Sequence, residues 1–133
     1  PEDGIEFYHG YTYSGHPLAA AAGLATLKVY EEEGLFDNAK TLAPVLEEEL
    51  QTIKGSPYVI DIRNYGMLGA IELQPIDGKP TARAMNVFRE CFAKGVLVRT
   101  TGDTIALCPP LIANEDQVRT VVRTVKESLD LID

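Results

Sequence analysis

The sequence predicts an α+β fold in which a small, mostly antiparallel sheet is covered by helices. The first observation is the order of the periodic segments, which is two helices, two strands, a helix, two strands and a last helix. Paired strands with helices between them are typical of this layered class. The second observation is size, because 133 residues with a hydrophobic fraction of 45% can bury one substantial core.

Two helices are predicted before the first strand. One runs from Pro17 to about Glu33, because proline suits the first helical position. A second is predicted within 35–53, where leucines and isoleucine recur at helical spacing. Pro44 either kinks this second helix or lies in the first turn of a helix capped near Thr41. The apolar stripe of the first helix is Leu24, Leu27 and Tyr30.

Two hairpins supply the predicted strands. The first joins 58–63 to 67–73 through a turn at Asn64-Tyr65-Gly66. The second joins 96–99 to 104–107 around Gly102-Asp103. Antiparallel pairing within each hairpin gives the mostly antiparallel sheet.

Helices are predicted after each hairpin. One begins at about Thr81 and is closed by Gly95, and the other begins behind Asn114, which with Gln117 makes a capping pair. The buried face of the first is predicted as Ala84, Met85, Phe88, Cys91 and Phe92. The buried stripe of the second is predicted as Val118, Val121, Val122, Val125, Leu129 and Ile132.

The charge balance limits the function. Twenty acidic against twelve basic residues give a net charge of −8, which argues against binding nucleic acid or an anionic membrane. One local basic site for a carboxylate is still allowed. No apolar run approaches transmembrane length and no signal-peptide pattern is present. Cys91 and Cys108 lie in apolar surroundings and are predicted as core residues of a cytoplasmic protein, where thiols stay reduced.

The segment 9–17 carries the clearest functional signal. Two glycines, hydroxyl side chains and tyrosines form a compact loop directly before Pro17 and an alanine-rich run, Ala19–Ala22. Exposed N–H groups at a helix N-terminus, the helix dipole and nearby hydroxyls favour an anion, most often phosphate. The alternative is a simple turn followed by a buried helix.

The amino-acid sequences of four segments resemble those of the class III aminotransferases, which are pyridoxal-phosphate enzymes of fold type I. The segments are the loop 9–17, then 65–73, 95–105 and 109–111, in family order along nearly the whole chain. The ω-amino acid or amine:pyruvate branch is the most similar. The resemblance implies a cofactor-pocket loop of the large domain in 1–16, a linking helix in 17–33, and the small C-terminal domain in 34–133.

The resemblance also implies site residues. Thr12, with Tyr11 and Ser14 beside it, would bind the cofactor phosphate of the neighbouring subunit, and Arg99 would bind the substrate carboxylate. The alternatives are a threonine that only stabilises the turn and a surface arginine paired with Asp103.

Arg63 and the two histidines are interpreted as structural residues and not as parts of a functional site. Arg63, at a predicted strand end, is interpreted as a former of salt bridges. His9 and His16 are seven residues apart without cysteine or clustered carboxylate partners, so no metal site is expected.

The reaction that the family implies is transfer of an amino group from an ω-amino acid or amine to pyruvate or another keto acid, in a homodimer or tetramer. None of the six lysines has the context of the lysine that forms a Schiff base with the cofactor. The chain is therefore expected to be the C-terminal part of an enzyme, with no catalytic residue of its own. A non-catalytic α+β binding module is the alternative, and it would cover 19–25 with its own residues.

Overall fold

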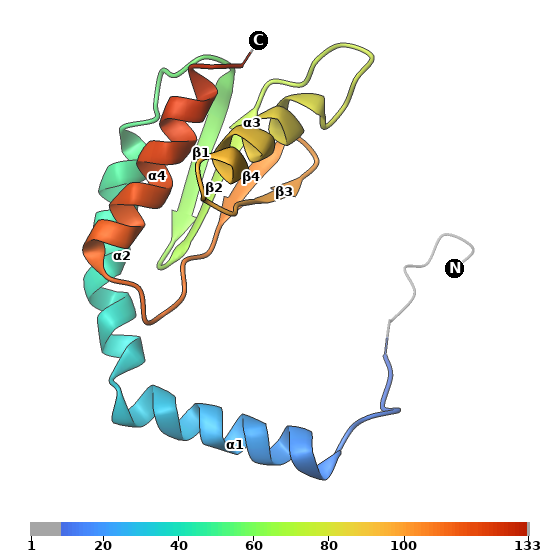
Figure 1. Ribbon diagram of the computed structural model, residues 1–133, viewed down its shortest axis with the longest axis vertical. Coiled ribbons are helices and arrows are strands. Elements are labelled where there is room, and N and C mark those ends of the chain that lie inside the picture. The colour runs from blue at the N-terminus through green and yellow to red at the C-terminus, as the bar shows by residue number, and fades with distance from the viewer. Residues whose placement is uncertain (1–8, 133) are drawn as a thin grey trace, which may run out of the picture. The chain divides into compact units, whose positions relative to one another are not determined.

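A computed structural model describes residues 9–132 of the chain (Figure 1). Contacts divide the chain into two units, one ending at Gly34 and one beginning at Leu35. Each unit is considered by itself.

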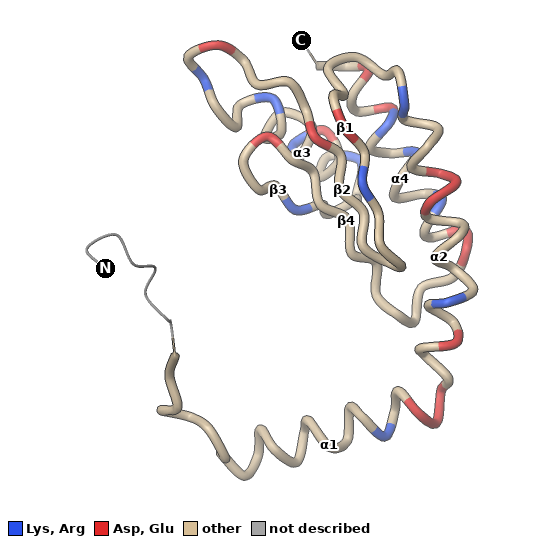
Figure 2. Tube along the Cα trace, turned by 180° about the vertical axis from the view of Figure 1, so that it is seen from behind, with Lys and Arg blue, Asp and Glu red and all other residues tan. Residues whose placement is uncertain are grey.

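The first unit consists of a loop and the helix α1 (Pro17–Glu32), which begins at the predicted proline. No residue of α1 is buried, and Leu24 and Leu27 are 70% and 62% exposed. Figure 2 shows that charged residues occur only toward the C-terminal end of α1. The described part of this unit therefore leaves a long uncharged helix surface uncovered.

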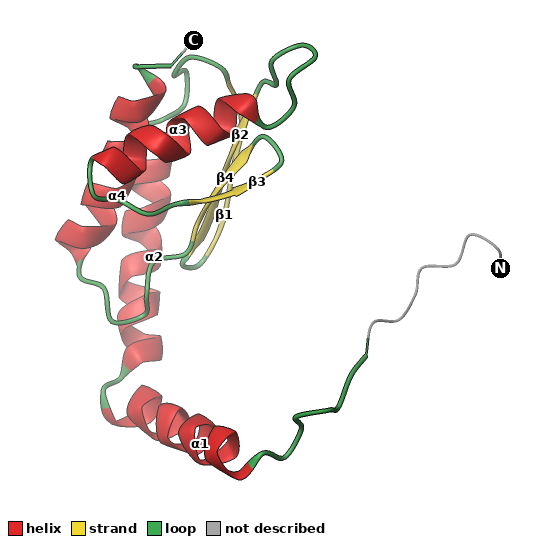
Figure 3. Cartoon of the chain, turned by 45° about the vertical axis from the view of Figure 1, so that its right-hand side comes forward, coloured by secondary structure: helices red, strands yellow, loops and turns green. Residues whose placement is uncertain are grey.

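The second unit is a four-stranded sheet with three helices on one face, as Figures 1 and 3 show. The strand order is β1-β2-β4-β3, and every neighbouring pair is antiparallel. This confirms the predicted α+β class. The elements are α2 (Leu35–Gln51), β1 (Val59–Tyr65), β2 (Leu68–Leu73), α3 (Ala82–Ala93), β3 (Arg99–Thr101), β4 (Thr104–Leu107) and α4 (Glu115–Leu129).

The pleat of the sheet separates a helix-covered face from an open face. Ile71 in β2 and Ile105 in β4 are fully buried under the helices, whereas their neighbours Ala70 and Ala106 are only half-buried on the other face. A Cβ on Gly69 would lie 2.8 Å from Cδ1 of Leu50. The absence of a side chain at Gly69 thus lets α2 approach the sheet closely.

The interface of α2 with α4 contains one buried carboxylate. The side chain of Glu49 is 8% exposed and pairs with Arg119, while Nε of Arg123 lies 3.7 Å from its second oxygen. Because a buried charge needs a partner, this pairing fixes how the two helices face each other.

The first hairpin differs from its prediction. Asn64 and Tyr65, expected in the turn, belong to β1 and pair with Gly69 and Leu68. The turn is Gly66 and Met67, and Gly66 has a φ of +56°, which glycine adopts without strain. Two-residue loops are the commonest connections in β-hairpins, and here both strands extend to such a loop.

The helix α2 continues through Pro44. The alternative of a helix that starts anew behind Thr41 is therefore wrong. The Thr41 hydroxyl instead donates to the Asp37 carbonyl oxygen at 3.0 Å, within the same helix.

The end of α3 explains why the strand predicted at 96–99 begins later than expected. The N–H of Val96 donates to the Cys91 carbonyl oxygen at 2.9 Å, and that of Gly95, with a φ of +84°, to the Phe92 carbonyl oxygen at 3.0 Å. These are the two bonds of a Schellman motif. Val96 therefore serves the helix end, and β3 begins only at Arg99.

The buried faces of α3 and α4 were predicted with unequal success. The predicted face of α3 is confirmed for its buried members Ala84 and Cys91, whereas Phe92 is 65% exposed and the fully buried Val87 was not predicted. The capping box of Asn114 and Gln117 is confirmed, with bonds of 2.9 and 3.0 Å. The predicted stripe of α4 is confirmed for its buried members Val118, Val122, Val125 and Leu129.

The two cysteines lie in different environments. Cys91 is buried, as predicted, and burial raises the pKa of its thiol. Cys108 is exposed, so its prediction as a core residue was wrong. It directly follows β4, where the chain leaves the sheet.

Candidate functional site

The loop before α1 is built from two successive turns. The N–H of Ser14 donates to the Tyr11 carbonyl oxygen at 3.0 Å, and that of His16 to the Tyr13 carbonyl oxygen at 3.2 Å. Gly15 has a φ of +75°, which permits the second turn. These backbone bonds close the loop and leave the side-chain hydroxyls on its surface.

The side chains of Tyr11, Thr12 and Ser14 are exposed. No hydrogen bond ties the Thr12 hydroxyl to another described residue, so a role in stabilising the turn is not supported. This hydroxyl is a neutral donor that can face an anion.

The N-terminus of α1 supplies further donors. His16 gives the helix no side-chain cap, the first turn holds no acidic residue, and the first backbone bond runs from Ala20 N–H to the His16 carbonyl oxygen at 2.9 Å. The amides of Leu18 and Ala19 therefore have no partner within the helix. In the described first unit, α1 is not buried, contrary to the alternative of a turn before a buried helix.

The open face of the sheet carries the second set of candidates. Arg63, Ala70, Ala106 and Arg99 are register partners across the four strands, one from each strand. We call these four residues the arginine row. Arg63 stands at one edge and Arg99 at the other, with two alanines between them.

The two arginines of this row differ in their partners. Arg63 pairs with Asp61 and, at 2.6 Å, with Glu72, and the hydrogen bonds that its guanidinium donates to Glu72 and then to Asp61 raise its pKa. This confirms a salt-bridge role, although Arg63 lies inside β1 and not at its end. The Arg63 charge is therefore matched by carboxylates.

Arg99 is exposed, and no described residue forms an ion pair or a side-chain hydrogen bond with its guanidinium. The alternative pairing with Asp103 is wrong, because Oδ2 of Asp103 accepts the N–H of Thr81 at 3.0 Å. A guanidinium without a carboxylate partner can bind a carboxylate of a ligand through two parallel hydrogen bonds.

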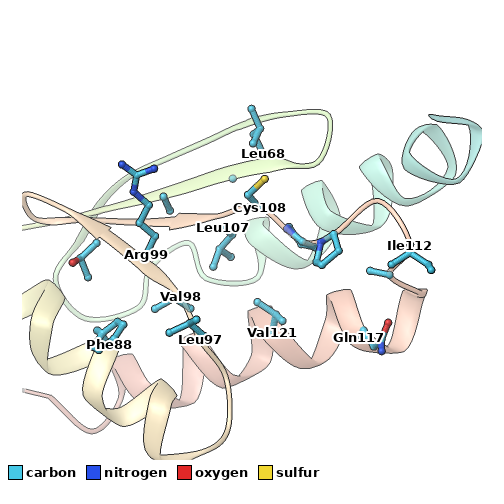
Figure 4. Close-up of a pocket in the computed structure, with 16 residues that line it drawn as sticks. Leu68, Phe88, Leu97, Val98, Arg99, Leu107, Cys108, Ile112, Gln117 and Val121 are labelled. Atoms are coloured by element: carbon cyan, nitrogen blue, oxygen red, sulfur yellow. The ribbon is translucent and has the colours of Figure 1, made fainter. Parts of the chain in front are cut away.

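A pocket of about 990 Å³ adjoins Arg99. Its lining is mostly apolar and comes from the sheet, from α3 and α4, and from the segment after β4. Arg99 is one of the residues that line this pocket, and Figure 4 shows its side chain extending away from Phe88, Leu97 and Val98. The arrangement offers a cation next to an apolar wall, which suits a small organic acid.

Two features of this site were absent from the sequence interpretation. The small residues Ala70 and Ala106 leave space beside Arg99, and the tie from Asp103 to Thr81 fixes the hairpin of Arg99. The alternation of residues in β2 and β4 could have placed Ala70 and Ala106 on the open face of the sheet, since successive side chains of a strand point to opposite faces. The contact with Thr81 spans 22 residues and left no local signal.

Solved transaminases share this fold. An omega transaminase mutant from Pseudomonas jessenii superposes with a TM-score of 0.83 at 34% identity, covering 93% of this chain and 29% of that chain. An adenosylmethionine-8-amino-7-oxononanoate aminotransferase from Methanocaldococcus jannaschii gives 0.83 at 28% identity, covering 96% and 31%. The fold is thus that of one part of a transaminase.

The sequence comparisons define the family. The model of the family Aminotransferase class-III matches residues 2–129. An omega-aminotransferase of Caulobacter vibrioides is 49% identical over 97% of this chain, and a beta-alanine–pyruvate aminotransferase of Pseudomonas aeruginosa is 41% identical over 98%. The chain belongs to the class III aminotransferases, as its motifs predicted. It spans 29% of the length of these curated relatives.

Proposed function

We propose that this chain is part of a pyridoxal-phosphate-dependent aminotransferase that moves an amino group from an ω-amino acid or amine to pyruvate or another keto acid. The observation that carries the proposal is Arg99, an exposed arginine without a carboxylate partner among the described residues, beside an apolar pocket. The names of the two relatives with 49% and 41% identity support this substrate class.

The uncovered helix α1 favours the enzyme over a free-standing binding module. Such a module would cover 19–25 with its own residues, but the described residues of the unit that contains α1 leave this helix without a buried residue. We assign 1–16 to a loop of the large domain, 17–33 to the linking helix and 34–133 to the small domain of a fold type I enzyme. The division of contacts between Gly34 and Leu35 supports this assignment.

The cofactor phosphate is assigned to the loop before α1. Thr12 donates its hydroxyl hydrogen to a phosphate oxygen, with Tyr11 and Ser14 on the same wall, and the amides of Leu18 and Ala19 add donors at the positive end of the helix. In the proposed homodimer or tetramer this phosphate belongs to the neighbouring subunit. Bound pyridoxal phosphate supplies the electron sink for moving an amino group, and the lysine that holds it lies elsewhere in the enzyme.

Arg99 is assigned to the substrate carboxylate. Its planar, permanently charged fork orients an amino acid or keto acid by two hydrogen bonds. A simple amine has no carboxylate and does not need this contact. The protein is assigned to the cytoplasm, which the free thiols of Cys91 and Cys108 support.

The activity is tested with the full-length protein loaded with pyridoxal phosphate. Incubation with β-alanine and pyruvate is expected to produce alanine, measured by chromatography against a reaction without donor. A panel of ω-amino acids and amines then defines the donor range. If no member of the panel yields alanine from pyruvate, the proposed reaction is wrong.

Thr12→Ala tests the cofactor assignment in the same enzyme. It removes one hydrogen bond to a charged group, worth about 1.5–3 kcal/mol, so the affinity for pyridoxal phosphate should fall roughly tenfold to a hundredfold. Cofactor titration of the stripped enzyme measures this affinity. Thr12→Ser keeps the hydroxyl and should retain most of it, whereas equal affinities of wild type and Thr12→Ala would remove Thr12 from the site.

A further inference from the structure

The strand that carries Arg99 is short and lies at the sheet edge. β3 has three residues and pairs only with β4 in the described sheet. Arg99 is the first of its residues, and the turn Gly102-Asp103 closes the hairpin at the other end. The position of the guanidinium therefore depends on contacts that hold this hairpin against the rest of the unit.

The N-terminus of α3 offers such a contact because it has no cap of its own. Thr81 precedes the helix with a φ of +67°, its side chain makes no capping bond, and the first turn contains no acidic residue. Oδ2 of Asp103 accepts the Thr81 N–H at 3.0 Å, from 22 residues further along the chain. A carboxylate at this end of a helix is favourable because it faces the positive end of the dipole.

The main chain of Asp103 is tied to the sheet as well. Its carbonyl oxygen accepts the N–H of Leu73 at 2.9 Å. One residue thus links the β3–β4 turn both to the end of β2 and to the start of α3. The hydroxyl of Thr100 adds a weaker contact to α3, at 3.5 Å from the sulfur of Met85.

A buried cation belongs to the same helix start. Arg83 is 7% exposed, its Nε donates to the Gln74 carbonyl oxygen at 2.7 Å, and its guanidinium lies 3.4 Å from the ring centre of Tyr58. Among the described residues, Nη1 of Arg83 and Oδ1 of Asp103 are the buried side-chain atoms without a hydrogen-bond partner.

We propose that Asp103 is a positioning residue for Arg99: by capping α3 from the β3–β4 turn, its carboxylate holds the edge strand where the Arg99 guanidinium meets the substrate carboxylate. The inference rests on the proposed function of Arg99. It predicts that loss of the Asp103 carboxylate weakens binding of the substrate carboxylate and leaves the half-reaction of a carboxylate-free amine unchanged.

The test uses the full-length holoenzyme and four variants: Asp103→Ala, Asp103→Asn, Arg99→Ala, and the double variant of Asp103→Ala with Arg99→Ala. Asp103→Ala should raise the KM for pyruvate roughly fivefold to twentyfold and change the half-reaction of a carboxylate-free amine less than about twofold. Asp103→Asn keeps an acceptor for the Thr81 N–H and should lie between Asp103→Ala and wild type. If Asp103→Ala folds poorly, the KM for pyruvate of Asp103→Asn still tests the inference.

The matched control is Asn114→Ala, which removes the same kind of side-chain cap from α4. It should lower the thermal midpoint comparably and leave the KM for pyruvate unchanged. An equal rise in KM for Asn114→Ala would mean that any loss of stability suffices, and would overturn the inference.

The double variant separates the two proposals. If Asp103 acts through Arg99, adding Asp103→Ala to Arg99→Ala should change the KM for pyruvate less than about twofold. The full Asp103 effect in that background would refute the positioning role and leave the role of Arg99 standing. If Arg99→Ala alone leaves the KM unchanged, the proposed function of Arg99 fails first and the role of Asp103 falls with it.

Discussion

Arg99→Ala should lower kcat/KM for carboxylate-bearing donors such as β-alanine by an amount equivalent to about 2–4 kcal/mol, because it removes a charged, two-point contact. Pyruvate also carries a carboxylate, so its half-reaction should suffer in the same way. A simple amine should react nearly as in the wild type. The two half-reactions must therefore be measured separately, by rapid mixing of donor or acceptor with the holoenzyme.

Two further variants sharpen this experiment. Arg99→Lys should recover only part of the loss, since an ammonium lacks the planar fork. Arg63→Ala is the matched control, because Arg63 lies in the same row but is already paired with Asp61 and Glu72. It should leave the KM for pyruvate unchanged. Equal losses for amine and carboxylate donors in Arg99→Ala would contradict the carboxylate role.

The second large effect is expected in the core, at the contact of α2 with β2. Leu50 is fully buried and faces Gly69. Leu50→Ala should lower the free energy of unfolding by about 2–5 kcal/mol, because the cavity that it leaves closes only in part. Thermal and denaturant unfolding of the full-length enzyme measure the loss.

The glycine opposite this leucine allows a coupling test. Gly69→Ala alone should destabilise by about 1–3 kcal/mol, since the new methyl group overlaps Leu50. In the Leu50→Ala background the same methyl has room, so the two losses should be less than additive. Leu131→Ala, at a leucine that is 64% exposed, is the control and should change stability little. Strict additivity would contradict the close approach of the helix and the sheet.

Local patterns in the sequence predicted much of this fold. The capping box of Asn114 and Gln117 and the closing glycine Gly95 act within a few residues, so they can be recognised without tertiary information. The α+β class followed from the order of segments with helical and strand periodicity. The predictions failed where two neighbouring helix faces both carry apolar residues, as in α3. Phe92 has the spacing of a buried face but is exposed, and Val87 on the neighbouring face is buried in the core.

The site was predictable only in part, for a physical reason. The motif placed Arg99 at the right strand, but its lack of a partner depends on Asp103, whose carboxylate could equally have paired with it across the turn. That carboxylate is engaged by a backbone N–H at the start of α3. Such a choice between two acceptable partners depends on tertiary packing, which a single sequence does not contain.

The remote cap of α3 also bears on the order in which the chain becomes structured during its synthesis. α4 carries its cap in Asn114 and Gln117, three residues apart, and can begin as soon as that segment emerges. α3 is completed only when Asp103 arrives, 22 residues behind Thr81. When the α3 segment has just been synthesised, its N-terminus therefore still lacks the contact with Asp103. We therefore expect α3 and the strand that carries Arg99 to reach their final form together.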